Sequence, residues 1–329
     1  GDVRERAGLY EDSVEGFGKA IRLAGTDVHR RAYLLFRRAR ARLWIGDYQM
    51  ALRDTSKGLK AVGTVQDAEA GRTRAMLNGF RAAIRQFQAR PQEALDSALT
   101  AVKEAQNVED DETLARGYLV LDWAYRVLGQ PDRAVHLPKA LAIYERMEYL
   151  PGVAETTMNL GAAAYMDGRW DDAVAWYTRS YDASLESGNQ VRAAVAGANM
   201  AELLIDQGHL DEADMRLGQA IRVLRASNNA GDSIFAELQA GRLMVERGRC
   251  DAAAAILERI KSEAASIGEA FSVLEASLEL ARSRLRAGDA PGGLAILNDA
   301  RDAAGGVPSH FAARFAYVDA LIRIELGEL

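Results

Sequence analysis

Glycine recurs along the chain at a nearly constant interval, and this interval constrains the fold more than any other feature. The repeated turn positions are Gly8, Gly46, Ala89, Gly129, Gly168, Gly208, Gly248, Gly288 and Gly327. Their successive spacings are 38, 43, 40, 39, 40, 40, 40 and 39 residues. A period held over nine positions indicates a repeat array, in which each unit packs mainly against its neighbours.

A small residue follows each turn position at a constant distance, which identifies the repeating unit as a pair of helices. Five residues after the turn the chain carries Ser13, Ala51, Ala94, Ala134, Ala173, Ala213, Ala253 and Gly293. The two helices of a hairpin can cross closely only where their side chains are small. The pattern predicts an all-α chain of about 16 helices, built as an α-solenoid of helix hairpins with a period near 40 residues.

The turn positions also divide the chain into repeats. Residues 1–25 are expected to form the second half of a repeat, residues 26–308 seven full hairpins, and residues 309–329 the first half of another. Residues 1–329 would then be a single array. Because terminal repeats normally carry a polar cap, we expect the chain to be a fragment of a larger multidomain protein.

Composition indicates a soluble helical protein. Hydrophobic residues make up 49% of the chain, but charges interrupt every apolar run well short of the roughly 18–20 residues that a bilayer requires. A single cysteine, Cys250, excludes an internal disulfide and favours a cytoplasmic location. Residues 1–60 hold 13 basic and 8 acidic residues, so the remainder carries a net charge of −11. We therefore expect no membrane partner, and a charge distribution that favours docking of a charged one.

Two positions depart from the repeat pattern. Ala89 replaces glycine at a turn, directly before Arg90-Pro91. Pro138 falls inside the helix expected from Pro131 onward, where it should cost about 3 kcal/mol or kink the helix. We expect a local irregularity near Pro138.

Residue pairs that contain one or two carboxylates, and could be mistaken for catalytic ones, begin several second helices. The pairs are Gln92-Glu93, Asp171-Asp172 and Asp211-Glu212. Acidic side chains favour the positive end of the helix dipole, so capping and electrostatics explain them better than acid–base chemistry.

No motif indicates a metal, a nucleotide or a nucleophile. The four histidines, which are His29, His136, His209 and His310, have no Cys, His or Asp partner at ligand spacing. Cys250 occupies a packing position two residues after a turn glycine. The glycines include no phosphate-binding loop motif. We expect no cofactor, no metal and no catalytic residue in this chain.

Arginines crowd one expected helix that contains no acidic residue between them. They are Arg30, Arg31, Arg37, Arg38, Arg40 and Arg42. Such a cluster can bind an acidic partner or nucleic acid. The favoured interpretation is a solvated face, partly paired with Asp and Glu of neighbouring helices. A net charge of −6 for the chain argues against nucleic acid.

The stretch from Met158 to Asn189 resembles a tetratricopeptide repeat (TPR). The resemblance rests on Asn159-Leu160-Gly161 and Tyr165, then Gly168-Arg169-Trp170-Asp171-Asp172-Ala173, then Tyr177. It implies a right-handed superhelix whose concave groove is lined by the first helix of each hairpin. The period near 40 exceeds the usual 34 residues of this family.

Transferring the groove positions from repeat to repeat selects eleven candidate site residues. They are Tyr33, Arg40, Arg116, Trp123, Glu155, Asn159, Asn199, Glu202, Arg242, Glu275 and Arg282. This mixture of aromatic residues, asparagines and both charge signs suits a peptide or a protein domain, including other domains of the same polypeptide. Ordinary polar surface is the alternative interpretation.

A narrower resemblance covers about residues 110–329. It adds the motifs Asp206-Gln207-Gly208-His209-Leu210-Asp211-Glu212-Ala213 and Ile267-Gly268-Glu269-Ala270-Phe271. These repeats are similar to the C-terminal TPR region of actinobacterial adenylate/guanylate cyclases that carry an AAA-type ATPase module. STAND-type transcriptional activators have similar repeats.

Either resemblance implies a non-catalytic regulatory scaffold that binds a protein or a peptide. A small-ligand sensor is the alternative. A TPR-like enzyme is a third hypothesis, but it requires a buried ionisable cluster in the groove, and the sequence spacing predicts none.

Overall fold

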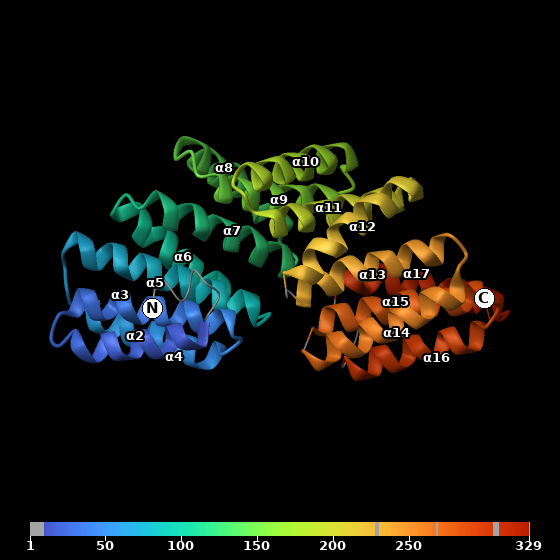
Figure 1. Ribbon diagram of the computed structural model, residues 1–329, viewed down its shortest axis with the longest axis horizontal. Coiled ribbons are helices and arrows are strands. Elements are labelled where there is room, and N and C mark those ends of the chain that lie inside the picture. The colour runs from blue at the N-terminus through green and yellow to red at the C-terminus, as the bar shows by residue number, and fades with distance from the viewer. Residues whose placement is uncertain (1–9, 228–229, 268, 305–308, 329) are drawn as a thin grey trace. The chain divides into compact units, whose positions relative to one another are not determined.

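The computed structural model describes residues 10–227, 230–267, 269–304 and 309–328. Within these ranges the regular elements are sixteen α-helices and one short 3₁₀ helix, which confirms the all-α prediction (Figure 1). The chain divides into two compact units, unit 1 (residues 1–152) and unit 2 (residues 153–329). No helix in the described part of the chain is long and apolar enough to cross a membrane.

Unit 1 alternates first and second helices of hairpins. The first helices are α3 (Val28–Trp44), α5 (Ala68–Phe87) and α7 (Asp111–Val127). The second helices are α2 (Tyr10–Leu23), α4 (Tyr48–Val62), α6 (Pro91–Asn107) and α8 (Leu137–Arg146), with the 3₁₀ helix η1 (Pro131–Arg133) before α8. Consecutive α-helices pack together, and α5 also contacts α3 and α7. These are the neighbours expected in stacked hairpins.

Unit 2 repeats this arrangement. Its first helices are α9 (Leu150–Met166), which begins at the end of unit 1, α11 (Gln190–Asp206), α13 (Ala230–Glu246), α15 (Ala270–Arg286) and α17 (Ser309–Glu325). Its second helices are α10 (Trp170–Glu186), α12 (Leu210–Ala226), α14 (Cys250–Ser266) and α16 (Ala290–Ala303). The first helices α11, α13, α15 and α17 contact one another in sequence. Together with the neighbouring pairs in unit 1, this gives a TPR-like α-solenoid fold.

The predicted turn positions adopt the left-handed backbone conformation wherever the structure describes them. The seven described turn glycines have φ between +72° and +82°. Ala89 adopts the same conformation with φ +52°, although its Cβ makes this cost about 1 kcal/mol. The structure therefore confirms the turn spacing, including the position that lacks glycine. Gly8 lies outside the described residues.

The small residues after the turns lie where the hairpin helices cross. Ser13, Ala51, Ala94, Ala173, Ala213 and Ala253 are fully buried, and Gly293 is buried too. Ala134 is the exception, because it is half-buried and lies between η1 and α8. Burial of these residues agrees with close helix crossing in the hairpins whose two helices both lie in the described residues and whose second helix is intact.

The chain is irregular near Pro138, as predicted. The expected helix breaks into η1 and α8, and Pro138 lies in the first turn of α8, where a missing N–H is tolerated. Buried Asp122 on α7 stabilises the break. Its carboxylate accepts hydrogen bonds from the backbone N–H groups of His136 and Leu137, both at 2.8 Å. The carboxylate also lies 2.7 Å from His136 Nδ1.

The acidic pairs lie in the first turns of α6, α10 and α12, which supports the electrostatic part of their interpretation. The capping part is wrong. The N-cap residues of these helices are Arg90, Arg169 and His209, and none of their side chains caps the helix. Asp172 instead accepts a hydrogen bond from Arg169 Nη1 at 2.6 Å.

Two glycines in first helices of unit 2 should respond oppositely to alanine. A Cβ at Gly161 would lie 2.5 Å from the buried ring of Tyr177, whereas a Cβ at Gly197 meets nothing within 4 Å. Overpacking costs typically 1–3 kcal/mol, and alanine gains about 1 kcal/mol over glycine in a helix. We expect Gly161→Ala to lower the free energy of unfolding by about 1 kcal/mol and Gly197→Ala to raise it by about as much. Urea titration measures both, and a gain at Gly161 would contradict the packing argument.

Candidate functional site: the first-helix face

The eleven predicted site residues share three positions in the first helices, 13, 9 and 6 residues before the turn position. Residues three or four apart lie on one side of an α-helix. We call this side the first-helix face, and it also includes the residue two positions before the turn. The two units carry different side chains on it.

Aromatic and basic side chains share the first-helix face of α3 in unit 1. Tyr33 is 48% exposed, and its hydroxyl accepts a hydrogen bond from Arg37 Nη1 at 3.1 Å. The Arg40 guanidinium lies 5.8 Å from the centre of the Phe36 ring. These contacts are cation–π and hydrogen-bonding arrangements within one helix.

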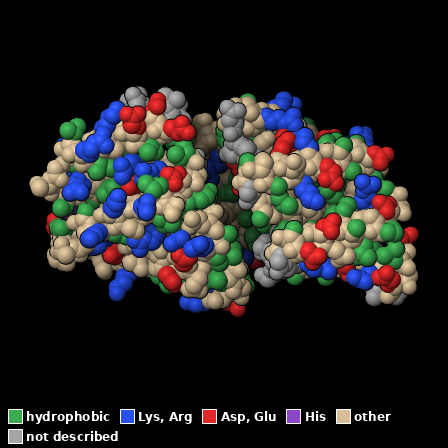
Figure 2. Space-filling model, turned by 90° about the horizontal axis from the view of Figure 1, so that it is seen from below, with side chains coloured by type: hydrophobic (Ala, Val, Ile, Leu, Met, Phe, Trp, Pro, Cys, Tyr) green, Lys and Arg blue, Asp and Glu red, His purple; other side chains and the backbone are tan. Residues whose placement is uncertain are grey.

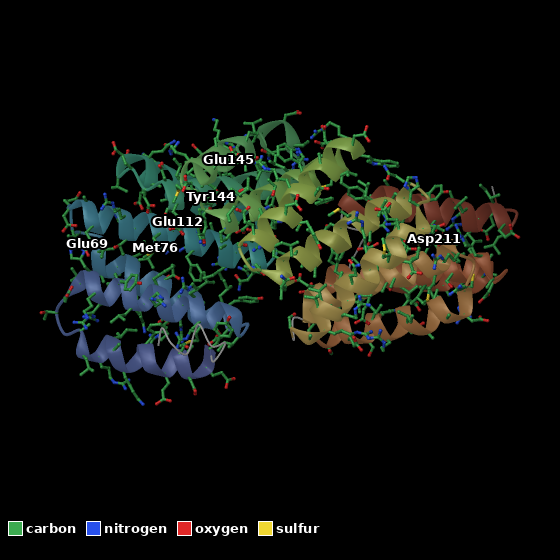
Figure 3. The ribbon with its side chains drawn as sticks, turned by 45° about the horizontal axis from the view of Figure 1, so that its top comes forward. Glu69, Met76, Glu112, Tyr144, Glu145 and Asp211 are labelled. Carbon is green, nitrogen blue, oxygen red and sulfur yellow. The ribbon has the colours of Figure 1, made fainter. Side chains whose placement is uncertain are left out.

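The other first helices of unit 1 carry fewer charges on this face. Arg116 on α7 is exposed and pairs with Glu112 at 3.1 Å. Trp123 on the same helix is half-buried. Met76 on α5 occupies the position 13 residues before Ala89 and is half-buried. Figure 3 labels Met76 on α5 and Glu112 on α7.

The arginine cluster on α3 is partly paired with a neighbouring helix, as the favoured interpretation predicted. Asp54 on α4 is 1% exposed and accepts hydrogen bonds from Arg38 Nε at 2.7 Å and Nη2 at 2.6 Å. Arg42 Nη1 donates to the same carboxylate at 2.5 Å. Figure 2 shows Lys and Arg side chains spread over the visible face of unit 1. Two of the six arginines are therefore structural.

Two asparagines occupy equivalent positions in unit 2. Nδ2 of Asn159 donates to the Glu155 carbonyl, and Nδ2 of Asn199 donates to the Val195 carbonyl, both at 2.9 Å. All four predicted residues in these two helices, Glu155 and Glu202 included, are half-buried. The asparagine carboxamides are thus oriented in the same way, one repeat apart.

Arg242 on α13 lies at the centre of a group of carboxylates. Its side chain is buried, and Nη2 donates a hydrogen bond to Asp206 Oδ1 on α11. Nη1 lies 3.7 Å from Glu202 Oε1, and Nε lies 4.0 Å from Glu279 Oε1 on α15. The Tyr165 hydroxyl of α9 donates to Asp206 at 2.5 Å.

Two further arginines extend this group across α15 and α17. Arg282 Nη1 donates to Glu279 at 2.7 Å, and Arg282 Nη2 donates to Glu246. Arg314 Nη1 donates to Glu275 at 2.7 Å, and Arg314 Nη2 donates to Glu279 at 3.1 Å. Glu275 and Glu279 are both buried.

The structure therefore brings four predicted residues together in one charged cluster of unit 2: Glu202, Arg242, Glu275 and Arg282. Sequence reasoning missed its other members: Asp206, Glu246, Glu279, Arg286 and Arg314. Glu279 and Arg314 lie 9 and 13 residues before a turn position, where the register of the predicted residues would have found them. Asp206, Glu246 and Arg286 lie two residues before a turn position, which that register did not include. The expectation that no buried ionisable cluster exists is wrong.

The cluster shifts the pKa of its members. Burial and, after it, the charge of Glu275 raise the pKa of Glu202 to about 7, although Arg242 opposes the change. Burial also raises the pKa of Tyr165, and Glu202 and Asp206 add to that effect, so the hydroxyl stays a donor. Burial lowers the pKa of Arg242, but Glu279 and Asp206 outweigh it and raise the pKa overall.

Glu237 on α13 has a lowered pKa, opposite to that of Glu202, because it is paired with two arginines. It accepts hydrogen bonds from Arg225 Nε at 2.8 Å and Arg259 Nη2 at 2.5 Å. The hydrogen bond from Arg225 lowers its pKa to about 2, although burial opposes this. Because the pKa is lower in the folded state, ionised Glu237 stabilises the fold at pH values above its unfolded-state pKa near 4.5. This stabilisation is lost as the pH falls toward 2.

The lowered pKa of Glu237 predicts how stability depends on pH. Between pH 6 and pH 2.5, wild type should lose about 1–3 kcal/mol more unfolding free energy than Glu237→Gln, the lower values reflecting solvent screening of the exposed arginines. Urea titrations at several pH values measure this difference. Parallel pH profiles for the two proteins would show that the ion pairs contribute nothing.

Metal-ligating residues do not gather in the parts of the chain that the structure describes, where no group of three or more His, Cys, Asp or Glu is placed to hold an ion. Cys250 is half-buried at the start of α14, and its carbonyl accepts a hydrogen bond from Ser283 Oγ at 2.9 Å. The His310 side chain lies outside the described residues.

Comparisons with known proteins place the fold. No family model and no curated protein sequence matches the chain. Among solved structures, aspartyl phosphate phosphatase F from Bacillus subtilis is 16% identical with a TM-score of 0.67, covering 88% of this chain and 73% of that one. The Rap conjugation gene regulator of plasmid pLS20, solved with the Phr* peptide, is 14% identical with a TM-score of 0.57 and covers 98% of both chains.

A third similar structure is a STAND protein with a tetratricopeptide repeat sensor, PH0952 from Pyrococcus horikoshii. It is 16% identical with a TM-score of 0.55 and covers 97% of this chain but 43% of that one. At such identities the likeness concerns the fold alone. By its fold, this chain is a TPR-like α-solenoid protein of the kind found in Rap proteins and in a STAND sensor region.

Proposed function

We propose that this chain is a non-catalytic module that binds a peptide or a segment of a partner protein along its first-helix face. The charged cluster of unit 2 carries this proposal. Burying charged groups is costly unless they are paired, and apolar residues of similar size are often at least as stabilising. A hairpin stack could fill these positions with aliphatic side chains. Polar groups from four successive first helices on one face therefore support recognition of a ligand.

The repeated asparagines support an extended peptide as the ligand. Asn159 and Asn199 present a carboxamide at the same position in consecutive repeats. A carboxamide can both donate and accept hydrogen bonds, as a peptide backbone does. The Rap regulator with a bound Phr* peptide supports the same reading through its similar fold. In a larger cytoplasmic signalling protein, the bound segment would include other domains of the same polypeptide.

A peptide library tests this function. Peptides selected on the wild-type chain should bind the Asn159→Ala, Asn199→Ala double variant at least tenfold more weakly, as measured by fluorescence anisotropy. Glu186→Ala on α10 is the matched control on an exposed second-helix position and should bind as wild type does. Equal binding to all three proteins, or cyclase or ATPase activity of the chain alone, would contradict the proposal.

A small-ligand sensor is the second candidate. It is supported by the similarity to the Pyrococcus STAND protein, which is described as having a repeat sensor. A ligand at 100 times its Kd stabilises a protein by about 2.7 kcal/mol, which a thermal-shift screen of metabolites detects. Stabilisation by a metabolite without any selected peptide would favour this candidate.

A further inference from the structure

The charged cluster of unit 2 contains more carboxylates than guanidiniums. Its five carboxylates are Glu202, Asp206, Glu246, Glu275 and Glu279, and its four guanidiniums are Arg242, Arg282, Arg286 and Arg314. Residues 153–329 as a whole hold 26 acidic and 17 basic residues. With all five carboxylates ionised, the cluster lacks one positive charge.

The missing charge can be assigned to one carboxylate. Asp206, Glu246, Glu275 and Glu279 each accept a hydrogen bond from an arginine. Glu202 accepts none from any arginine of the described residues, since its nearest guanidinium nitrogen, Arg242 Nη1, is 3.7 Å away. Arg242 Nη1 has no hydrogen-bond partner either. The Glu202 side chain is 13% exposed, so its carboxylate is not completely shielded from solvent.

Gln239 provides a second observation, because its counterpart one repeat later, Glu279, lies 4.0 Å from Arg242 Nε, and the same register places Gln239 on α13 toward Glu202 on α11. It lies one helical turn before Arg242, at the position that Asn199 and Glu279 occupy in the adjacent repeats. Its side chain is fully buried, and neither Oε1 nor Nε2 has a hydrogen-bond partner among the described residues. A buried carboxamide without partners costs about 1–3 kcal/mol in typical proteins, so such groups are usually completed by a ligand or water.

We propose that this corner binds a cationic side chain, a lysine or an arginine of the partner segment, against the Glu202 carboxylate, with Gln239 Oε1 as a further acceptor. This inference rests on the proposed function and names the chemistry of its ligand. A guanidinium or ammonium group would supply the missing charge and would donate hydrogen bonds to the Glu202 carboxylate and to Gln239 Oε1. An anionic group would instead add to the excess of carboxylates.

Binding of a cation at Glu202 must be linked to its protonation. The charged or titratable groups facing Glu202 are Tyr165 on α9, Tyr177 on α10, Asp206 on α11, Arg242 on α13, Glu275 on α15 and Arg314 on α17. In the ligand-free chain, burial raises the pKa of Glu202 to about 7. If the cation binds only ionised Glu202, its apparent affinity should rise about tenfold between pH 6 and pH 8.

Two small probes test the site without knowledge of the natural ligand. Nα-acetyl-arginine amide carries the guanidinium, and Nα-acetyl-citrulline amide is its neutral isostere. ¹³C NMR of the full chain labelled at glutamate carboxyls follows Glu202, whose signal is assigned by its loss in Glu202→Gln. Arginine amide should lower the pKa of Glu202 and bind about tenfold more tightly at pH 8 than at pH 6, whereas citrulline amide should do neither.

Two variants separate this site from nonspecific charge effects. Glu202→Gln should abolish the pH dependence of arginine amide binding, and Glu212→Gln, which removes an exposed carboxylate on α12, should retain it. Equal binding of the two probes, or an unchanged pH dependence in Glu202→Gln, would overturn the inference.

The outcome also distinguishes this inference from the proposed function. If selected peptides bind the first-helix face with the same affinity in wild type and in Glu202→Gln, the proposed function is supported and the cation site is contradicted. Binding of arginine amide at Glu202 without any selected peptide would support the site and contradict peptide recognition.

Discussion

Replacing Arg242 with methionine is expected to lower the free energy of unfolding by about 3–5 kcal/mol, measured by urea titration at pH 7. Arg242 is buried and hydrogen-bonded to Asp206, and it lies within 4.0 Å of Glu202 and Glu279. Methionine has a similar length but no charge. It would leave Asp206 and Glu279 in a buried site with less positive charge, and removing one partner of a buried ion pair is far more costly than removing an exposed one.

Arg247→Met is the matched control on the same stretch of chain. Arg247 makes contacts of 2.6 Å with Asp211 and 2.5 Å with Asp214, but both carboxylates are exposed. Exposed ion pairs contribute about 0–1 kcal/mol, so this variant should unfold almost as wild type does. Adding Asp206→Leu to Arg242→Met should recover part of the loss, because it removes a carboxylate left without its arginine. Equal losses for Arg242→Met and Arg247→Met would contradict the role given to burial.

The fold was predictable because its strongest determinant is local and periodic. In the described residues, a residue with positive φ every 39 to 43 positions terminates each first helix, and a small residue five positions later allows the second helix to cross it. Both requirements concern single residues, so the sequence displays them directly. Pro138 revealed the break before α8 for the same reason. The part played by Asp122 was not predictable, because its carboxylate reaches backbone groups 14 and 15 residues away.

The candidate site was only partly predictable. The helical register correctly placed Glu202, Arg242, Glu275 and Arg282 on one face. It could not show that Arg282 and Glu246 meet across 36 residues, or Arg314 and Glu275 across 39, because these distances depend on how adjacent repeats stack. The difference between a paired carboxylate and an unpaired one, which separates Glu279 from Glu202, is a property of three-dimensional contacts alone.

Asp54→Ala should be comparably damaging in unit 1, with an expected loss of about 3–5 kcal/mol in the free energy of unfolding. Asp54 is 1% exposed and binds Arg38 through two hydrogen bonds and Arg42 through one. Alanine would leave two guanidiniums, with side chains only 17% and 11% exposed, without their carboxylate. Circular dichroism during urea titration measures the loss.

Asp111→Ala provides the comparison within the same unit. Asp111 pairs with Arg146 at 2.6 Å, a distance like those at Asp54, but the two side chains are 45% and 62% exposed. We expect a change of no more than about 1 kcal/mol. If both variants lost the same free energy, ion-pair distance rather than burial would control stability here. A large loss at Asp54 alone would show that the α3 arginines join α3 to α4, which leaves Tyr33 and Arg40 as the residues of α3 to vary when a partner for unit 1 is sought.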